Sequence, residues 1–380
     1  MLINGKKALA SVQEIIGVIP LYMGHYVITE DNERLFCPDL DDDGNRKYSD
    51  SLERVVVLGW SLVADKGVFQ VCDKCVFIET GSLVPSSSEE GGYYCVKARN
   101  IPEFGICSQG MVAPLSAFGI DPETPIGTDL TDVLGILSSK QETAPETPVF
   151  EQKGGILSKI FPKKNNAFSC DFPTEVNKTS LEYVQNIPRI LSDKTPMIVT
   201  ELLDGLSTTW LMIRRGKEKF DFCVCSHDFR IPEPIDGSTN IYWEMARKYD
   251  AYKQLKDYLM EHPKLEWVCI QGEIYGEGVN GSHALVPGCN FAAFSFMNSK
   301  YGRFDSWESA DLLDSWPTCI PWVPFVSMKY VLPDLVQDLQ YFAEGSSLLN
   351  PELPRKGLVF RSVESAFKVV SPEYLKYYSL

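Results

Sequence analysis

The sequence predicts an α+β protein in which a small β-barrel module precedes a domain of mixed strands and helices. Three observations lead to this prediction. Residues 1–120 hold short β-branched and aromatic runs between turn signals, residues 121–172 are rich in Pro, Thr, Ser and Gly, and strand and helix patterns alternate from residue 173 onward. We therefore expect a barrel over 1–120, a linker over 121–172 and a second domain over 173–380.

The N-terminal strands are predicted from local composition. Apolar runs at 54–63, 68–71 and 75–78 are separated by turn signals at 65–67 and 72–74. Short strands at this spacing are typical of a small barrel. The linker carries a basic patch at Lys159, Lys163 and Lys164, where we expect any RNA contacts of the linker to lie.

The linker is expected to hold at most one short helix, and the other predicted helices belong to the second domain. Residues 241–260 have the length and periodicity of a helix, and residues 332–343 show the same pattern more weakly. Thr179 and Glu182 form a potential capping box, which predicts a helix that ends near Pro188.

The composition excludes several classes of protein. Of 380 residues, 44% are hydrophobic, which excludes disorder, and no apolar run reaches the ~18–20 residues of a membrane span. The N-terminal segment shows no convincing cleavage site, so we expect a cytoplasmic protein without membrane contact. The net charge is −15, and residues 1–150 carry 11 basic and 22 acidic residues, or −11. Nucleic-acid binding would therefore need a local basic groove.

The 11 cysteines are expected to be reduced thiols. Cys72 and Cys75 form the one close pair outside apolar runs, and no second Cys or His pair lies at a spacing that would complete a zinc site.

Four segments in the second half carry residues suited to chemistry. Any one of them is weak, because an Asp-Gly after an apolar strand is usually only a turn. Their order and spacing are more specific. The segments are VTELLDG at 199–205, FCVCSHD at 222–228, CIQGEIYG at 269–276, and KGLVFR at 356–361 followed by FKVVS at 367–371.

This ordered set resembles the covalent nucleotidyltransferase superfamily of ATP-dependent ligases and RNA capping enzymes. It is most similar to RNA ligases that carry an OB-type module before the nucleotidyltransferase domain. The segments 59–60, 66–69, 73–79, 83–85 and 108–110 look like that module, and 184–188 looks like the interdomain helix. The resemblance implies an OB-type β-barrel followed by an ATP-grasp-like adenylation domain, with antiparallel sheets around a nucleotide cleft. It also implies ATP or AMP and Mg²⁺ as cofactors, and RNA ends or a nicked duplex as partners.

In such ligases a lysine followed by x-Asp-Gly attacks the α-phosphate of ATP, and the AMP then passes to an RNA 5′-phosphate. Three positions that carry this chemistry differ here. Leu202 stands at the nucleophile, His227 replaces an arginine that serves the nucleotide, and Lys356 replaces a glutamate directed at the metal. A leucine has no lone pair with which to attack phosphorus.

Other positions match the family. Glu201, Asp204 and Gly205 flank the nucleophile position, and the resemblance assigns them to nucleotide binding. Glu273 matches the third motif, where it would bind the ribose or the metal. The remaining matches are Phe294, in the aromatic segment, and Lys368, which would contact phosphate although Ala366 replaces a preceding lysine.

Three hypotheses for function follow. The chain is a pseudoenzyme that binds nucleotide or RNA ends without lysine adenylylation, an active RNA ligase in which Lys356 is a relocated nucleophile, or a protein-interaction scaffold with an unidentified protein partner. The same residues also have a purely structural interpretation. In it, Leu202 belongs to the core, Glu273 ends a strand, and His227 is a polar residue with satisfied hydrogen bonds.

Overall fold

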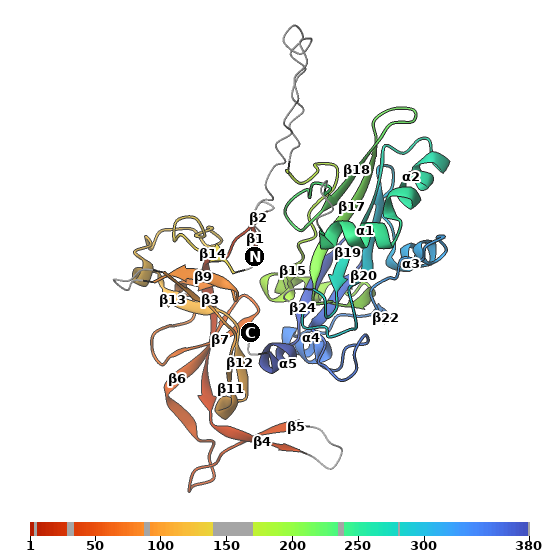
Figure 1. The fold of residues 1–380 in the computed structure, drawn as a ribbon. Coiled ribbons are helices and arrows are strands. Elements are labelled where there is room, and N and C mark those ends of the chain that lie inside the picture. The colour runs from red at the N-terminus through yellow and green to blue at the C-terminus, as the bar shows by residue number, and fades with distance from the viewer. Residues whose placement is uncertain are drawn as a thin grey trace.

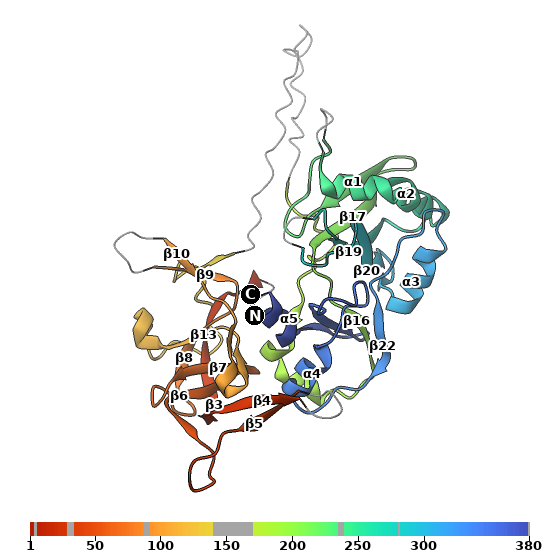
Figure 2. The ribbon, with the colours of Figure 1, turned by 60° about the horizontal axis from the view of Figure 1, so that its bottom comes forward.

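The computed structural model describes residues 1–3, 6–28, 34–86, 92–139, 170–234, 239–279 and 282–378. The N-terminal unit, up to residue 139, and the C-terminal unit, from residue 170, lie side by side, and both chain ends lie between them (Figures 1 and 2). The predicted basic patch at Lys159, Lys163 and Lys164 lies outside the described residues. Within the described ranges, no helix is long and apolar enough to cross a membrane.

A five-stranded antiparallel sheet forms the centre of the N-terminal unit. Its long strand β3 pairs with β8 through residues 10–14 and with β6 through residues 15–22. The strand order is β13 (Met111–Pro114), β8 (Lys74–Ile78), β3 (Ala10–Tyr22), β6 (Tyr48–Val57) and β7 (Trp60–Asp65). In β6 alternate residues such as Val55 and Val57 are buried, as in a strand with one exposed face. Residues 10–13 of β3 and 75–78 of β8 are all buried, so both faces of the sheet are covered there.

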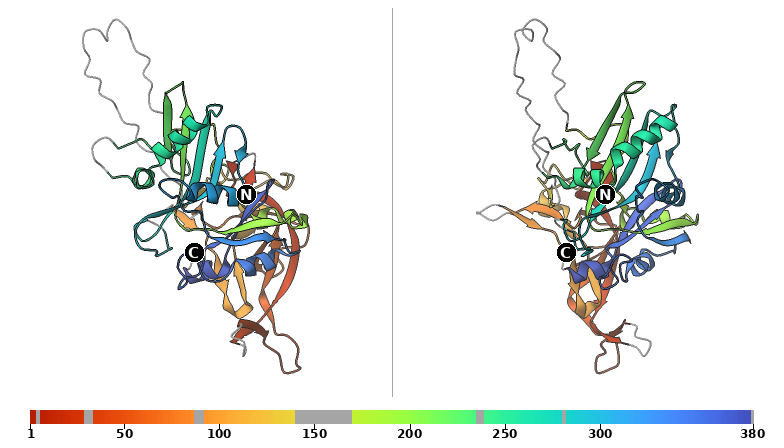
Figure 3. Two further views of the ribbon diagram at one scale, coloured as in Figure 1. Left: turned by 90° about the vertical axis from the view of Figure 1, so that its right-hand side faces the viewer. Right: turned by 45° about the vertical axis from the view of Figure 1, so that its right-hand side comes forward.

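Shorter pairs of strands surround this sheet. They are β1 (Leu2–Ile3) with β2 (Lys6–Lys7), β4 (Gly24–Ile28) with β5 (Arg34–Pro38), β11 (Arg99–Ile101) with β12 (Ile106–Ser108), and the trio β10 (Tyr93–Cys95), β9 (Ser82–Pro85) and β14 (Leu137–Ser138). Two 3₁₀ turns, η1 (Pro102–Phe104) and η2 (Leu115–Phe118), connect them. The β4–β5 hairpin lies at the outer end of the unit (Figures 1 and 3). Leu130 and Ile136, from the stretch predicted as linker, pack in the same core as β3 and β8.

Two five-stranded sheets form the C-terminal unit. One has the order β15 (Glu182–Tyr183), β24 (Ala366–Val370), β23 (Gly357–Arg361), β16 (Met197–Glu201) and β22 (Phe325–Tyr330). The other has the order β18 (Phe220–Cys225), β17 (Leu206–Arg214), β19 (Trp267–Tyr275), β20 (Asn290–Asn298) and β21 (Gly302–Arg303). Every pair is antiparallel except β15 with β24, as the prediction of antiparallel sheets requires.

Helices cover one face of each sheet in this unit. Helices α1 (Ile241–Lys248), α2 (Ala251–Glu261) and α3 (Ser306–Asp314) bury one core against β17–β20, and α4 (Val336–Ala343) buries another against β16, β23 and β24 (Figure 3). Helix α5 (Pro372–Tyr377) follows β24. The other faces of the two sheets meet, because Arg361 of β23 lies over the ring of Phe294 of β20 at 5.5 Å. The motif residues lie where these faces meet.

The structure corrects several predicted elements. Strand 75–78 is confirmed as β8, but 54–63 is a hairpin that turns at Leu58 and Gly59, and 68–71 is a turn rather than a strand. The helix predicted over 241–260 breaks at Asp250, which adopts φ 49° and separates α1 from α2. The helix predicted after Thr179 is wrong: strand β15 pairs with β24 there, and only the 3₁₀ turns η4 (Val184–Asn186) and η5 (Pro188–Ser192) follow.

The two units meet through the first of these 3₁₀ turns. Gly59 N–H donates to the carbonyl of Gln185 at 2.7 Å, and Trp60 Nε1 donates to Asn186 Oδ1 at 2.6 Å. A Cβ on Gly59 would lie 2.9 Å from the Cα of Gln185, so only glycine allows the two backbones to approach this closely. The two units therefore contact each other through their backbones as well as through side chains.

Candidate functional site

The first motif lies at the end of β16, where the chain turns toward β17. Leu202 N–H donates to the carbonyl of Gly357 at 2.9 Å, which holds this turn against β23. A Cβ on Gly205 would lie 2.0 Å from the carbonyl oxygen of Ile274, so the absence of a side chain lets the turn contact β19. Gly205 therefore brings Asp204 beside the strand that carries Glu273.

The carboxylate of Asp204 accepts bonds from several elements. Lys356 Nζ lies 2.8 Å from Oδ1. Oδ2 accepts from the backbone N–H of His283 at 2.7 Å and from the hydroxyl of Tyr374 at 2.8 Å, and it lies 2.8 Å from His283 Nδ1. The Asp204 side chain is only 7% exposed. We call Asp204, His283, Lys356 and Tyr374 the Asp204 network.

The charges of Asp204 and Lys356 stabilise each other. Burial alone would raise the pKa of Asp204, but the Lys356 ammonium and the hydrogen bonds from Lys356, His283 and Tyr374 hold it well below its usual value of 3.8. Burial alone would lower the pKa of Lys356, but Asp204 and then Glu273 raise it above 10.5. Both groups are therefore ionised at neutral pH, and Lys356 is an ammonium rather than a free amine.

The space beside the network is small. Residues 201–204, 283–284 and 353–356, with Ser347 and Tyr374, enclose a cavity of about 20 Å³. Roughly 10–15 Å³ on this measure holds one water molecule, whereas a drug-sized ligand needs a pocket of several hundred Å³. The cavity accepts a water molecule and not a nucleotide.

Glu201 is fixed by the loop after α4. Its Oε2 accepts the backbone N–H of Leu348 at 2.8 Å. Burial raises the pKa of Glu201, although Ser347, Leu348 and Arg355 oppose this rise. This carboxylate is thus bonded within the protein.

Lys368 lies between the Asp204 network and the N-terminal unit. Its Nζ lies 4.2 Å from the centre of the Tyr183 ring. Burial, together with the nearby Lys356 ammonium, lowers the pKa of Lys368 from 10.5 to about 8. Glu79 and Glu182 oppose this decrease and therefore lie close to Lys368.

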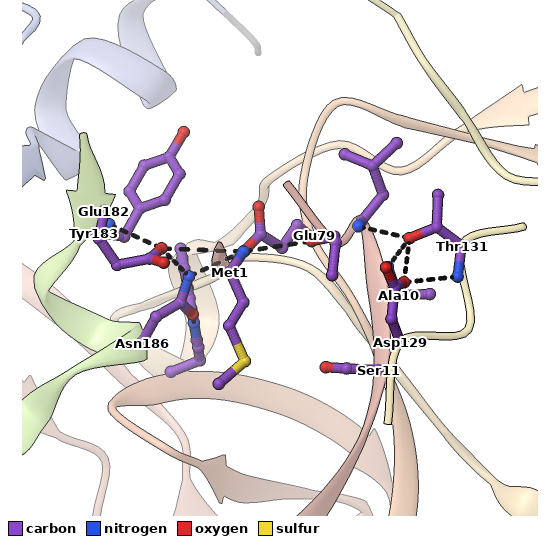
Figure 4. Close-up of polar contacts among 12 residues, drawn as sticks. Met1, Ala10, Ser11, Glu79, Asp129, Thr131, Glu182, Tyr183 and Asn186 are labelled. Atoms are coloured by element: carbon purple, nitrogen blue, oxygen red, sulfur yellow. Dashed lines mark hydrogen bonds and ion pairs between the residues drawn. The ribbon is translucent and has the colours of Figure 1, made fainter. Parts of the chain in front are cut away.

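Figure 4 shows the polar contacts around these two glutamates. Asn186 Nδ2 donates to Glu79 at 2.8 Å and to Glu182 at 2.6 Å, and the N-terminal ammonium of Met1 pairs with Glu79. The predicted phosphate-binding lysine therefore lies at a charged interface between the two units.

The remaining predicted residues divide into two groups. Glu273 lies close enough to Lys356 and Lys368 to affect the pKa of each, and Phe294 packs beside the cluster that contains Leu203. His227 lies elsewhere: its Nε2 is 3.0 Å from Ser180 Oγ, and its Nδ1 is 3.2 Å from Asp228. The structure thus brings the substituted Lys356 and Leu202 together with Asp204, and leaves His227 among surface polar groups.

His283 and Tyr374 were not predicted as site residues. His283 belongs to no motif, and nothing in its local sequence indicates a contact with Asp204. The sequence does hold a signal for Tyr374, namely the helix-capping residue Ser371 at the end of the last motif. Ser371 Oγ accepts the backbone N–H of Tyr374 at 3.2 Å and so caps α5. A cap at Ser371 places Tyr374 in the first turn of a helix, where its hydroxyl donates to Asp204.

The groups around the Asp204 carboxylate are not suited to a divalent metal that would bind together with a nucleotide. Mg²⁺ binds carboxylate oxygens and water, but the Asp204 oxygens face an ammonium and three N–H or O–H groups. Among the described residues, no group of three or more His, Cys, Asp or Glu side chains is placed to hold a metal ion. The Lys356 ammonium lies 2.8 Å from Asp204 Oδ1, and a positive charge there repels a metal cation.

Comparisons with known proteins identify the fold. No protein-family model matches the chain, and no curated protein matches it in sequence. Solved structures of Naegleria gruberi RNA ligase do match. The ligase with pyrophosphate has a TM-score of 0.72 at 23% identity, covering 98% of this chain and 99% of that chain.

Two variants of the same Naegleria gruberi ligase give similar values. A glutamate-to-alanine variant with ATP and Mn has a TM-score of 0.73 at 22% identity, covering 98% of this chain and 100% of that chain. A lysine-to-methionine variant with AMP and Mn has a TM-score of 0.70 at 24% identity, covering 97% and 98%. The chain thus has the fold of this RNA ligase over nearly its whole length.

Proposed function

We propose that this protein is a pseudoenzyme with the RNA ligase fold, which binds RNA ends without adenylylating itself. Its N-terminal unit is an OB-type barrel, and its C-terminal unit is a nucleotidyltransferase domain in which the nucleotide cleft is closed by the Asp204 network. The observation that carries the proposal is the ion pair between Lys356 and Asp204, 2.8 Å long, beside a leucine at the nucleophile position.

The strand order supports the OB-type assignment. An OB fold is a five-stranded, partly open Greek-key barrel, and in a Greek key the fourth strand returns to lie beside the first. The N-terminal sheet has five strands in the order β13-β8-β3-β6-β7, so its fourth strand, β8, lies beside its first, β3. The open side is bridged where Gln109 N–H donates to Ser61 and Val63 N–H donates to Ser108 Oγ.

The chemistry of self-adenylylation supports the absence of catalysis. A neutral lysine nitrogen must form a bond to the α-phosphorus while the bond to pyrophosphate breaks, and the proton on nitrogen must leave. Leu202 offers no nitrogen. A metal or other cation must also offset charge on the phosphates, and Lys356 removes the carboxylate expected to direct that metal.

A relocated nucleophile is less well supported. Lys356 would have to lose a proton that Asp204 and Glu273 hold in place, and it would have to break its bond to Asp204. An ammonium has no lone pair with which to attack. The scaffold hypothesis has its own supporting observation, the net charge of −15, which favours basic protein partners over nucleic acid.

Two measurements test the proposal. Intact-mass spectrometry after incubation with ATP and Mg²⁺ should show no gain of one AMP. Fluorescence anisotropy with a labelled RNA bearing a 5′-phosphate, and with a nicked duplex, should show saturable binding that weakens as salt increases. An AMP adduct mapped to Lys356 or Lys368 would establish the relocated-nucleophile hypothesis. An unmodified protein that binds neither RNA would favour the scaffold.

A further inference from the structure

A second concave site lies beside α4, and none of its residues lines the Asp204 cavity. It is a groove of about 590 Å³, far larger than that cavity. Its lining comes from the end of β22, the outer side of α4, the residues after α4 and the start of α5. The lining residues are Tyr330, Asp338, Tyr341, Phe342, Glu344, Gly345 and Glu373.

The aromatic wall of this groove is anchored to the core. Helix α4 buries Val336, Leu339 and Ala343, and this spacing directs Asp338 and Tyr341 outward. The Phe342 ring stacks on Tyr330 at 4.4 Å and 18°, and Tyr330 in turn contacts the buried Phe360 at 5.5 Å. These contacts fix the rings of Tyr330 and Phe342 before any ligand binds, whereas Tyr341 is 76% exposed.

The groove is also acidic. Asp338, Glu344 and Glu373 contribute three carboxylates, and the C-terminal end of α4 adds the partial negative charge of its carbonyl groups. Arg355 lies close to Glu373, but its guanidinium donates to the carbonyls of residues 342–344. Because Arg355 already occupies this helix end, the carboxylates that line the groove provide the attraction for a further cation.

We propose that this groove binds lysine and arginine side chains from a basic segment of a partner protein. Aromatic faces beside carboxylates attract organic cations through cation–π and charge-assisted contacts. A divalent metal prefers oxygen ligands alone, and a nucleic acid would be repelled by the three carboxylates. The net charge of −15 further favours a basic partner by raising its association rate. This inference concerns a different site from the proposed function and does not depend on it.

The experiment uses the full chain and a fluorescein-labelled peptide of alternating Arg, Gly and Lys. Fluorescence anisotropy measures its affinity for the wild type and for Asp338→Asn and Tyr341→Ala. Each substitution removes one cation-binding contact at an exposed site, so each should weaken binding about two- to five-fold. Both side chains lie on the exposed side of α4, so circular dichroism should show that the variants fold.

The matched control is Glu308→Gln on α3. Glu308 is an exposed carboxylate of the same unit, next to the 56% exposed Trp307, but it does not line the groove. We expect Glu308→Gln to bind the peptide as the wild type does. If Glu308→Gln weakens binding as much as Asp338→Asn, the peptide senses net charge alone and the proposal is wrong. A wild-type protein that does not bind the peptide, or groove variants that bind it unchanged, would also overturn it.

Discussion

Replacing Lys356 by methionine tests whether the Asp204 network closes the cleft. The substitution keeps the length and apolar stem of the side chain and removes only its charge. Asp204 is 7% exposed and the Lys356 side chain 20% exposed, so the carboxylate loses its counter-ion in a setting with little water. We expect a large loss of stability because an unpaired buried charge is costly.

The magnitude follows from the contacts that remain. Removing one partner of a buried ion pair costs about 3–5 kcal/mol. Asp204 would still accept bonds from His283 and Tyr374, and Lys356 is not fully buried, so we expect about 2–3 kcal/mol. At roughly 2–4 °C per kcal/mol for a unit of this size, the melting temperature should fall by about 5–10 °C.

The pH dependence gives an independent check. In the wild type the folded pKa of Asp204 lies below 3.8, so its stabilising contribution is present above that pH and is lost as the pH falls through the folded pKa. Without Lys356, only the hydrogen bonds from His283 and Tyr374 oppose burial, the largest contribution, so we expect the folded pKa of Asp204 to rise above 3.8. The variant therefore loses stability as the pH rises from 4 to 7, and its difference from the wild type should be larger at pH 7 than at pH 4.

Urea denaturation at both pH values measures this difference, and Lys194→Met is the matched control. Lys194 forms an ion pair of similar length, 2.7 Å, with Asp334, but the side chains are 47% and 90% exposed. That pair should contribute no more than about 1 kcal/mol. If Lys356→Met costs no more than Lys194→Met, or if its cost is the same at pH 4 and pH 7, the Asp204 network does not stabilise the closed cleft.

Two further predictions concern Leu202 and Lys368. Leu202→Lys alone should not yield an AMP adduct, because the arginine and the metal-directed carboxylate are still absent. The triple change Leu202→Lys, His227→Arg and Lys356→Glu should have the best chance of forming one. An adduct on the single variant, detected by intact-mass spectrometry, would show that the arginine and the carboxylate are dispensable. Lys368 has a folded pKa of about 8 against 10.5 when unfolded, so the wild type should gain about 1–3 kcal/mol relative to Lys368→Met as the pH rises from 8 to 10.5. Denaturation curves at pH 7, 8 and 10 check this, and a constant difference would mean that Lys368 titrates normally.

Much of the fold could be predicted because its signals are local. A short apolar run between turn signals predicted β8, and helical periodicity predicted α4 and the region of α1 and α2. Asp250 was not foreseen as a break, because a left-handed residue in a continuous polar pattern leaves no mark on periodicity. The segment after Thr179 became a strand because β24 supplies a pairing partner, and a tertiary contact of this kind outweighs a capping signal.

Only the site residues that belong to the four motifs could be predicted from the sequence. The order of the four motifs placed Leu202, Asp204, Glu273 and Lys356 in one region, and the structure brings Lys356 to Asp204. The pairing itself is a contact between residues 152 positions apart, which no sequence spacing reveals. His283 joins the network because the loop that carries it lies beside the first motif in the fold. The residues next to His283 in the sequence do not indicate this contact.

Helix α5 has a consequence for local unfolding. It has only six residues, too few to be stable alone, and it depends on contacts in three directions. Tyr374 donates to Asp204, Glu373 accepts from Gly345, and Lys376 lies 5.8 Å from the ring of Tyr26 in the N-terminal unit. These contacts should form and break together, so the amide protons of α5 should exchange as one cooperative group. Their exchange rate would then report the opening of the cleft, the groove and the inter-unit contact in a single measurement.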